Sequence, residues 1–199
     1  MLLLVSGTAY PRDATVGHLI VPRQWGTNLD LQPGCWAMDN GAFSGFDEGA
    51  FMRMLERFAD RPGCLFVTAP DVVADAAATL ARWPFWVRVL HGLGLPPAFV
   101  AQDGIVPTRV PWDGMGALFI GGSTAFKESP EAESLCALAK ARGLWVHMGR
   151  VNSKRRIRLA QRFGVDSYDG TGCNVAPDVN IPKMQRFDDE IHQQPELRL

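Results

Sequence analysis

The stretch Ala117-Leu118-Phe119-Ile120-Gly121-Gly122-Ser123 is an apolar run that ends in two glycines and a serine. An apolar run without polar alternation is typical of a strand buried on both faces, as in a parallel sheet. Trp145-Val146-His147-Met148-Gly149 is a similar run, and a helix is expected between the two. Ser129-Pro130-Glu131 has the residues of a helix start, and Arg142-Gly143 those of its end. This order predicts a parallel β-α-β unit.

The same alternation of short apolar runs and helical patterns extends along most of the chain. Further helices are expected to begin at Asp47 and near Asn152. Strands are expected at residues 2–6, 35–39, 65–70, 98–102, 117–121, 145–149 and 167–169. Repeated units of this kind predict an α/β fold, here a compact TIM-type (β/α) barrel with about seven clear strands, complete or incomplete. A flavodoxin-like open sheet is the alternative.

The length of 199 residues fits a single domain that spans residues 1–199. Residues 8–34 show little pattern, and we expect them to form a long loop that covers one end of the barrel. From Cys173 onward the proline and polar content rises. An irregular C-terminal segment is therefore expected at residues 173–199, which leaves open whether an eighth strand closes the barrel.

Composition restricts the classes of partner. Lys and Arg number 20 and Asp and Glu 21, so the net charge of -1 gives no bulk attraction to a polyanion, and any nucleic-acid contact must come from a local patch. No segment approaches the roughly 18 apolar residues of a membrane span. The four cysteines form no C-x-x-C pair and have no metal-ligand spacing. We expect a cytoplasmic protein with reduced thiols, no metal and no cofactor.

Polar residues and glycines stand at the C-terminal ends of the expected strands. Since a parallel barrel has its active site at these ends, they should share one mouth. A single acidic residue at such a place is more often a helix cap, but several together are harder to explain that way. Carboxylates and an amide can bind the donor-rich edge of guanine, and glycine lets the backbone approach its ring. The set comprises Asp39, Asp71, Gln102, Gly121, Gly122, Gly149 and Asp169.

An ordered set of segments resembles motifs of the tRNA-guanine transglycosylase superfamily. Residues 38–43 (M-D-N-G-A-F) resemble its D-S-G-G-F-Q motif, and residues 165–170 (V-D-S-Y-D-G) its V-D-M-F-D-C motif, whose second aspartate is the nucleophile. The resemblance implies that Asp169 is the nucleophile and that Asp71 binds guanine. It extends to residues 69–71 (A-P-D), 100–104 (V-A-Q-D-G, similar to G-I-V-Q-G), 119–123 (F-I-G-G-S, similar to G-G-L) and 147–149 (H-M-G, similar to M-G-V-G).

The chain also departs from that pattern. Asn40 and Ala42 replace Ser and Gly of the first motif, Gly170 replaces Cys of the last, and the C-x-C-x-x-C zinc site is absent. The tRNA-positioning insertions are missing too. These departures make the chain more similar to the short phage and bacterial relatives that insert 7-deazaguanine bases into DNA. The expected partners are therefore DNA, rather than tRNA, and a 7-deazaguanine base, with a homodimer or a partner chain as a way to bind duplex DNA.

Breaking an N-glycosidic bond places positive charge on C1′, which a carboxylate can capture. Asp166 and Asp169 are the candidates, and at a spacing of three they point to opposite faces of a strand. Asp169 stands at the strand end before an open Gly170-Thr171-Gly172 loop, so it is the expected nucleophile. Asp166 stands at the strand start, where a salt bridge or turn is expected.

The other polar residues of the mouth are expected to serve the base. Asp39 would be the general acid or base, and Asp71 and Gln102 would bind the base edge. The Gly122 N–H would donate to the carbonyl oxygen of the base, with Gly121 and Gly149 admitting the ring. Phe43 is a candidate for stacking on the base.

One strongly basic run, residues 150–158, follows an expected strand at the start of a helix. A solvated helix face is as common an explanation, but its position favours contacts to backbone phosphates. The expected phosphate-binding residues are Arg150, Lys154, Arg155 and Arg156. His147, one step inside its strand, is expected to be a satisfied core histidine.

The residues also leave two other functions open. The first is a hydrolase or lyase that acts on a free nucleoside or a small phosphorylated metabolite. The second is a non-catalytic DNA-binding barrel that binds nucleic acid without exchanging a base.

Overall fold

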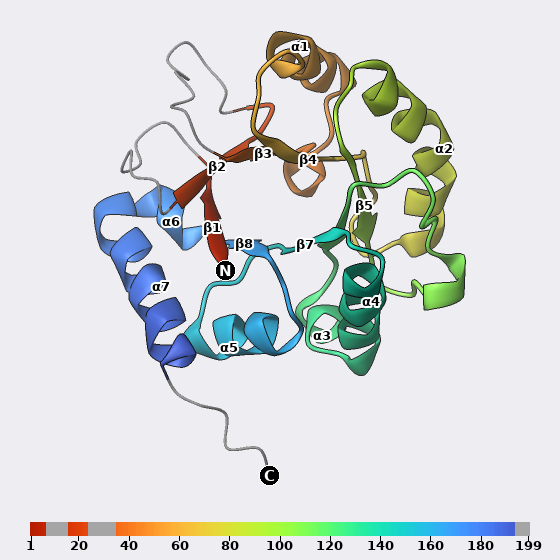
Figure 1. Cartoon of the computed structure of the whole chain (residues 1–199). Coiled ribbons are helices and arrows are strands. Elements are labelled where there is room, and N and C mark those ends of the chain that lie inside the picture. The colour runs from red at the N-terminus through yellow and green to blue at the C-terminus, as the bar shows by residue number, and fades with distance from the viewer. Residues whose placement is uncertain (7–15, 24–34, 194–199) are drawn as a thin grey trace.

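Eight parallel strands close a barrel in the computed structural model, which describes residues 1–6, 16–23 and 35–193 (Figure 1). Strand β8 pairs with β1, so the sheet has no free edge. This closure confirms the TIM-type barrel and rules out the open sheet. The strands follow one another in chain order: β1(Leu2–Val5), β2(Val16–Ile20), β3(Trp36–Met38), β4(Cys64–Thr68), β5(Pro97–Ala101), β6(Ala117–Ile120), β7(Trp145–Met148) and β8(Ser167–Asp169).

The expectation of one long loop over residues 8–34 was wrong, because β2 lies within it. This strand pairs with both β1 and β3 and completes the count of eight. Gly17 and His18 interrupt its apolar pattern and hid it. Gly17 is required here because a Cβ atom would lie 2.4 Å from Cδ2 of Leu4. The rest of the expected loop, residues 8–15 and 24–34, lies outside the described residues.

The expectation of an irregular segment over residues 173–199 was also wrong for the part described. A 16-residue helix occupies most of it, with Pro177 in the first turn, where a missing N–H costs no hydrogen bond. Pro182 lies inside this helix, and Ile181, Met184 and Ile191 pack on the core. The prolines were therefore misleading as a sign of irregular structure. Residues 194–199 lie outside the described residues.

Helices surround the barrel (Figure 1). Their starts follow the capping rules, with Asp47 and Ser129 each accepting a backbone N–H of the first turn. The helices are α1(Glu48–Phe58), α2(Ala76–Gly92), α3(Thr124–Lys127), α4(Pro130–Ala141), α5(Lys154–Arg162), α6(Gly172–Val175) and α7(Pro177–His192), with short 3-10 turns η1(Ala42–Ser44) and η2(Pro107–Arg109). No helix in the described part of the chain is long and apolar enough to cross a membrane.

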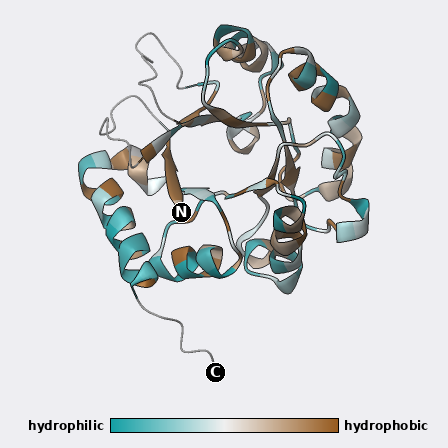
Figure 2. Ribbon diagram, in the orientation of Figure 1, coloured by the Kyte–Doolittle hydropathy of each residue, from teal (hydrophilic) through white to brown (hydrophobic). Residues whose placement is uncertain are grey.

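The core has two layers, one between strands and helices and one inside the barrel. Figure 2 shows most strands as hydrophobic and the outer helices as a mixture of hydrophobic and hydrophilic residues, with α7 mostly hydrophilic. Phe66 and Phe119 meet inside the barrel with ring centroids 6.3 Å apart. His147 lies against both rings and is fully buried. The barrel interior is therefore filled below the level of the strand ends, which leaves space at the mouth only.

Candidate active site

A cavity of about 280 Å³ lies at the C-terminal ends of the strands. All the residues expected to be catalytic or to bind substrate line it, so the parallel barrel brings together strand ends that are far apart in the chain. Arg150 of the basic run lines it as well. The expected residues in its wall are Asp39, Phe43, Asp71, Gln102, Gly121, Gly122, Gly149, Arg150 and Asp169.

Asp169 ends β8 and is held in place by two hydrogen bonds. Its Oδ2 lies 3.1 Å from Nε2 of His147, and its Oδ1 accepts the backbone N–H of Arg150 at 3.0 Å. The other ring nitrogen of His147 lies 2.9 Å from Oγ of Ser167, which accepts the indole N–H of Trp145. Because an indole only donates, the Ser167 hydroxyl can donate to Nδ1, which leaves the proton on Nε2 to donate to Asp169.

His147 is therefore the satisfied core histidine that the sequence suggested, and it also has a role that the sequence did not suggest. Its hydrogen bond orients the carboxylate of Asp169. Nothing in the apolar run around it signals this, because the partner lies 22 residues further on, across a strand pair.

Asp39 follows β3 and lines the same cavity. Its Oδ1 accepts the backbone N–H of Gly41 at 2.6 Å, in a turn where Gly41 has a φ of 76°. Burial raises the pKa of Asp39 to about 7, and the nearby charges of Asp169 and Asp71 contribute in the same direction. A carboxyl group with a pKa near neutrality can both give and take a proton.

Asp71 is clamped by two amides. Oδ1 accepts from the Asn40 side chain at 2.8 Å, and Oδ2 accepts from the Gln102 side chain at 2.6 Å. Asn40 also donates to Thr68 and to the carbonyl of Ala69. Burial raises the pKa of Asp71. Asn40, which in the sequence was only a departure from a motif, thus fixes Asp71, whose oxygens keep further lone pairs for a ligand.

The glycines let the backbone form the cavity wall. Gly122 has a φ of 71°, and a Cβ atom there would lie 2.4 Å from Oδ2 of Asp103. Asp103 accepts both the backbone N–H and the hydroxyl of Ser123, which holds this turn. At Gly149 a Cβ atom would lie 2.8 Å from the ring of Phe119. Side chains at these positions would collide with Asp103 and with the Phe119 ring, so the wall requires glycine at both.

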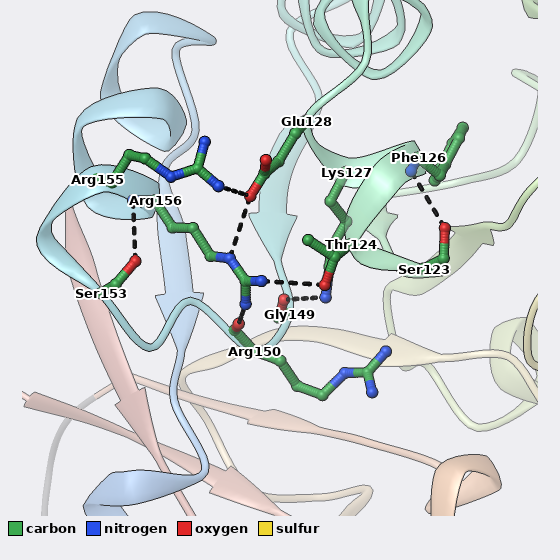
Figure 3. Close-up of polar contacts among 10 residues, drawn as sticks. All are labelled: Ser123, Thr124, Phe126, Lys127, Glu128, Gly149, Arg150, Ser153, Arg155 and Arg156. Atoms are coloured by element: carbon green, nitrogen blue, oxygen red, sulfur yellow. Dashed lines mark hydrogen bonds and ion pairs between the residues drawn. The ribbon is translucent and has the colours of Figure 1, made fainter.

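Of the four expected phosphate-binding residues, Arg150 lines the cavity and the other three lie outside it. Lys154 pairs with Glu190 at 2.5 Å, and Arg155 and Arg156 both pair with Glu128, as Figure 3 shows. None of these three lysine and arginine side chains lines the main cavity. Two carboxylates on other elements, Glu190 and Glu128, thus hold three of the cations in this run in ion pairs.

Arg150 behaves differently. It has a φ of 58°, and its guanidinium donates to the carbonyl of Gly122 at 2.9 Å. The guanidinium carbon also lies 4.2 Å from the centre of the Phe43 ring, which is 67% exposed at the rim. Phe43 is therefore placed to stack on a flat group, and in this structure that group is Arg150.

Lys127 was missed by sequence reasoning. It ends α3, lines the cavity and is buried, with 4% of its surface exposed. Its Nζ donates to the carbonyl of Gly149 at 3.1 Å. Burial, together with the charge of Arg150, lowers its pKa to about 8. A lysine in the last turn of a short helix is usually solvated, so no sequence signal singled it out.

Asp166 lies at the opposite end of β8 from the cavity. It forms an ion pair with Lys140 at 2.6 Å and accepts the backbone N–H of Val146 at 2.8 Å. This confirms the expected salt bridge. Within the described residues no group of three or more His, Cys, Asp or Glu side chains has the arrangement of a metal site.

No family model and no curated protein matches the chain. Among solved structures, one chain of the Amycolatopsis orientalis BexX/CysO complex is similar at 15% identity and a TM-score of 0.55, over 98% of this chain and 84% of that one. Tryptophan synthase from M. tuberculosis matches at 15% identity and 0.49, over 79% and 59% of the two chains. The YdjI aldolase from Escherichia coli K12 matches at 15% and 0.44, over 81% and 76%.

None of these three is named as a transglycosylase, and at such identities the likeness concerns the fold alone. The first match agrees with the closed parallel sheet. The chain is therefore an α/β barrel of the TIM type, with its candidate active site at the C-terminal ends of its strands.

Proposed function

We propose that this protein is an enzyme that exchanges guanine for a 7-deazaguanine base in a nucleic acid, with DNA favoured over tRNA. The proposal rests mainly on one observation, that Asp169 and Asp39 share one cavity in different environments. Asp169 is oriented by two N–H groups, whereas burial raises the pKa of Asp39 to about 7. Two carboxyl groups that differ in this way suit a nucleophile and a proton donor for glycosidic bond cleavage.

The exchange takes place in two balanced steps. A carboxylate oxygen of Asp169 attacks C1′, the C1′–N9 bond breaks, and the leaving guanine takes the proton of Asp39. The incoming 7-deazaguanine then loses its ring N–H proton to Asp39 and attacks C1′ from the same side as the departed base. The ester bond to Asp169 breaks, and the sugar keeps its original configuration.

The cavity wall offers partners for the base. The paired side chains of Asp71 and Gln102 present lone pairs and an amide N–H to a guanine edge, and Gly122 brings its backbone close. The cavity of about 280 Å³ suits one nucleoside rather than a duplex, so a base in DNA would have to be flipped out of the helix. The ordered resemblance to the transglycosylase motifs supports this assignment of roles.

A second candidate is chemistry on a free nucleoside or a small phosphorylated metabolite. It is favoured by the ion pairs of Lys154, Arg155 and Arg156, which reduce the positive charge that this surface offers to a DNA backbone. The same catalytic pair would then serve hydrolysis, with water in place of the incoming base.

The test is incorporation of a labelled 7-deazaguanine by the purified protein into duplex DNA, single-stranded DNA and tRNA, with deoxyguanosine in a parallel assay. We expect label in DNA and, without an incoming base, a covalent protein–DNA adduct on a peptide that contains Asp169. Guanine release from deoxyguanosine alone would favour the second candidate. Binding of DNA with neither exchange nor adduct would point to a non-catalytic barrel.

A further inference from the structure

Two cations, Lys127 and Arg150, line the cavity. Within the described residues neither forms an ion pair with Asp or Glu, and the side chain of each donates a hydrogen bond to a backbone carbonyl. Figure 3 shows the contrast with Arg155 and Arg156, which both reach Glu128. Buried or half-buried cations are normally paired, so this arrangement points to an anion from outside the chain.

The ammonium group of Lys127 supports this inference by its capacity to donate. It carries three N–H donors, and the carbonyl of Gly149 accounts for one of them. The carboxylates of Asp169 and Asp103 act on Lys127 from a longer distance, against the repulsion of Arg150 and Arg156. Lys127, a residue of which 4% is exposed, therefore has donors to spare beside the cavity.

Arg150 also contacts the proposed reaction centre. Its backbone N–H binds Asp169 while its side chain donates to Gly122. Its φ of 58° is unusual for a residue with a Cβ atom and is a sterically strained backbone conformation. This conformation turns backbone and side chain to the same cavity, so an anion held by the guanidinium lies close to the carboxylate that attacks C1′.

We propose that Lys127 and Arg150 form an internal subsite for a phosphate group of the substrate nucleotide, distinct from the ion-paired run of Lys154, Arg155 and Arg156. The nature of the nucleotide rests on the proposed function, whereas the binding of phosphate by this pair does not. The phosphate ester can belong to a DNA chain or to a free nucleotide. In either case the subsite holds the phosphate group in the same cavity as Asp169.

The test is equilibrium binding, by calorimetry, of deoxyguanosine, deoxyguanosine 5′-monophosphate and a single-stranded oligonucleotide that contains one guanine. We expect the wild-type protein to bind the phosphorylated ligands more tightly than the nucleoside. Lys127→Met should weaken binding of at least one phosphorylated ligand about ten- to hundredfold and leave deoxyguanosine affinity unchanged. Lys127→Arg should restore part of the loss, because it keeps the charge.

Lys154→Met is the matched control, because it removes a lysine that is paired with Glu190 outside the cavity. It should leave all three affinities within about twofold of wild type. If the affinity for the monophosphate depends on Lys127, the natural ligand is a free nucleotide. If only the affinity for the oligonucleotide depends on Lys127, the ligand is a DNA phosphodiester. The proposal is overturned if Lys127→Met and Lys154→Met lose the same affinity for the phosphorylated ligands, or if Lys127→Met loses none.

Thermal unfolding of each variant shows whether Lys127→Met has kept its fold, and if it has not, Lys127→Arg and Lys127→Gln carry the same comparison. A phosphate preference that depends on Lys127, in a protein that shows no base exchange, would keep the subsite and reject the proposed function.

Discussion

The two ends of the barrel use their carboxylates in opposite ways. At the N-terminal end Asp166 pairs with Lys140, and Asp188 pairs with the amino group of Met1. At the C-terminal end Asp39, Asp71 and Asp169 have amide, imidazole or backbone N–H partners, and within the described residues none forms an ion pair with Lys or Arg. One end thus stabilises the fold, and the other keeps its carboxyl groups available for chemistry, as is usual for this architecture.

Asp169 and Asp166 lie at opposite ends of β8, so the same substitution at each position tests this difference most directly. Asp169→Asn should lower the rate of base exchange by a factor on the order of 10³ or more, because an amide is a poor nucleophile toward C1′. The unfolding free energy should change little. Asp166→Asn should instead cost about 1 kcal/mol of stability, since it weakens the ion pair with Lys140, and keep the exchange.

The measurements are labelled-base incorporation, adduct trapping and urea unfolding of both variants. If Asp169→Asn still forms the adduct while Asp166→Asn is well folded but inactive, the roles assigned to the two ends of the barrel are reversed.

His147 tests whether orientation of the carboxylate matters at the C-terminal end. His147→Phe removes the hydrogen bond to Asp169 and should lower kcat about ten- to hundredfold while KM stays near its wild-type value. His147→Gln keeps an N–H donor and should recover part of kcat. If both variants raise KM or unfold the protein to the same degree, His147 serves packing only.

The free energy of unfolding should depend on pH through Asp39, because the charged form of this carboxyl group at the C-terminal end destabilises the fold. Its pKa in the folded protein, about 7, lies above the ordinary 3.8 of an aspartate, so the folded state holds the proton more tightly than the unfolded state does. The stability from this proton is fully present below pH 3.8 and is lost as the pH rises to about 7. Above pH 7 the folded protein carries the charge in a buried place.

Asp39→Asn should therefore be more stable than wild type at pH 8, by on the order of 1–2 kcal/mol, and this advantage should shrink as the pH falls. The same variant should lose most of the base exchange. Urea unfolding of both proteins between pH 4 and 8 measures the difference. Unfolding free energies that run parallel across this range would show that Asp39 titrates normally.

The sequence alone determined the α/β class and which polar residues at the strand ends line the mouth. Seven apolar runs had strand character, and each polar residue or glycine behind a run was bound to reach the same end once the strands were parallel. Asp39, Asp71, Gln102 and Asp169 could therefore be placed together without knowledge of any contact between them. The resemblance to transglycosylase motifs proposed roles for them, and these roles remain predictions.

Only the tertiary structure decided the remainder, because it depends on partners far apart in the chain. Strand β2 has a weak pattern and is defined by its pairing with β1 and β3. The basic run looked like a phosphate site until Glu128 and Glu190, 27 and 36 residues away from Arg155 and Lys154, came to lie beside it. Lys127 was not singled out from the sequence, and its burial beside Gly149 follows from how α3 packs on the barrel, which no local pattern encodes.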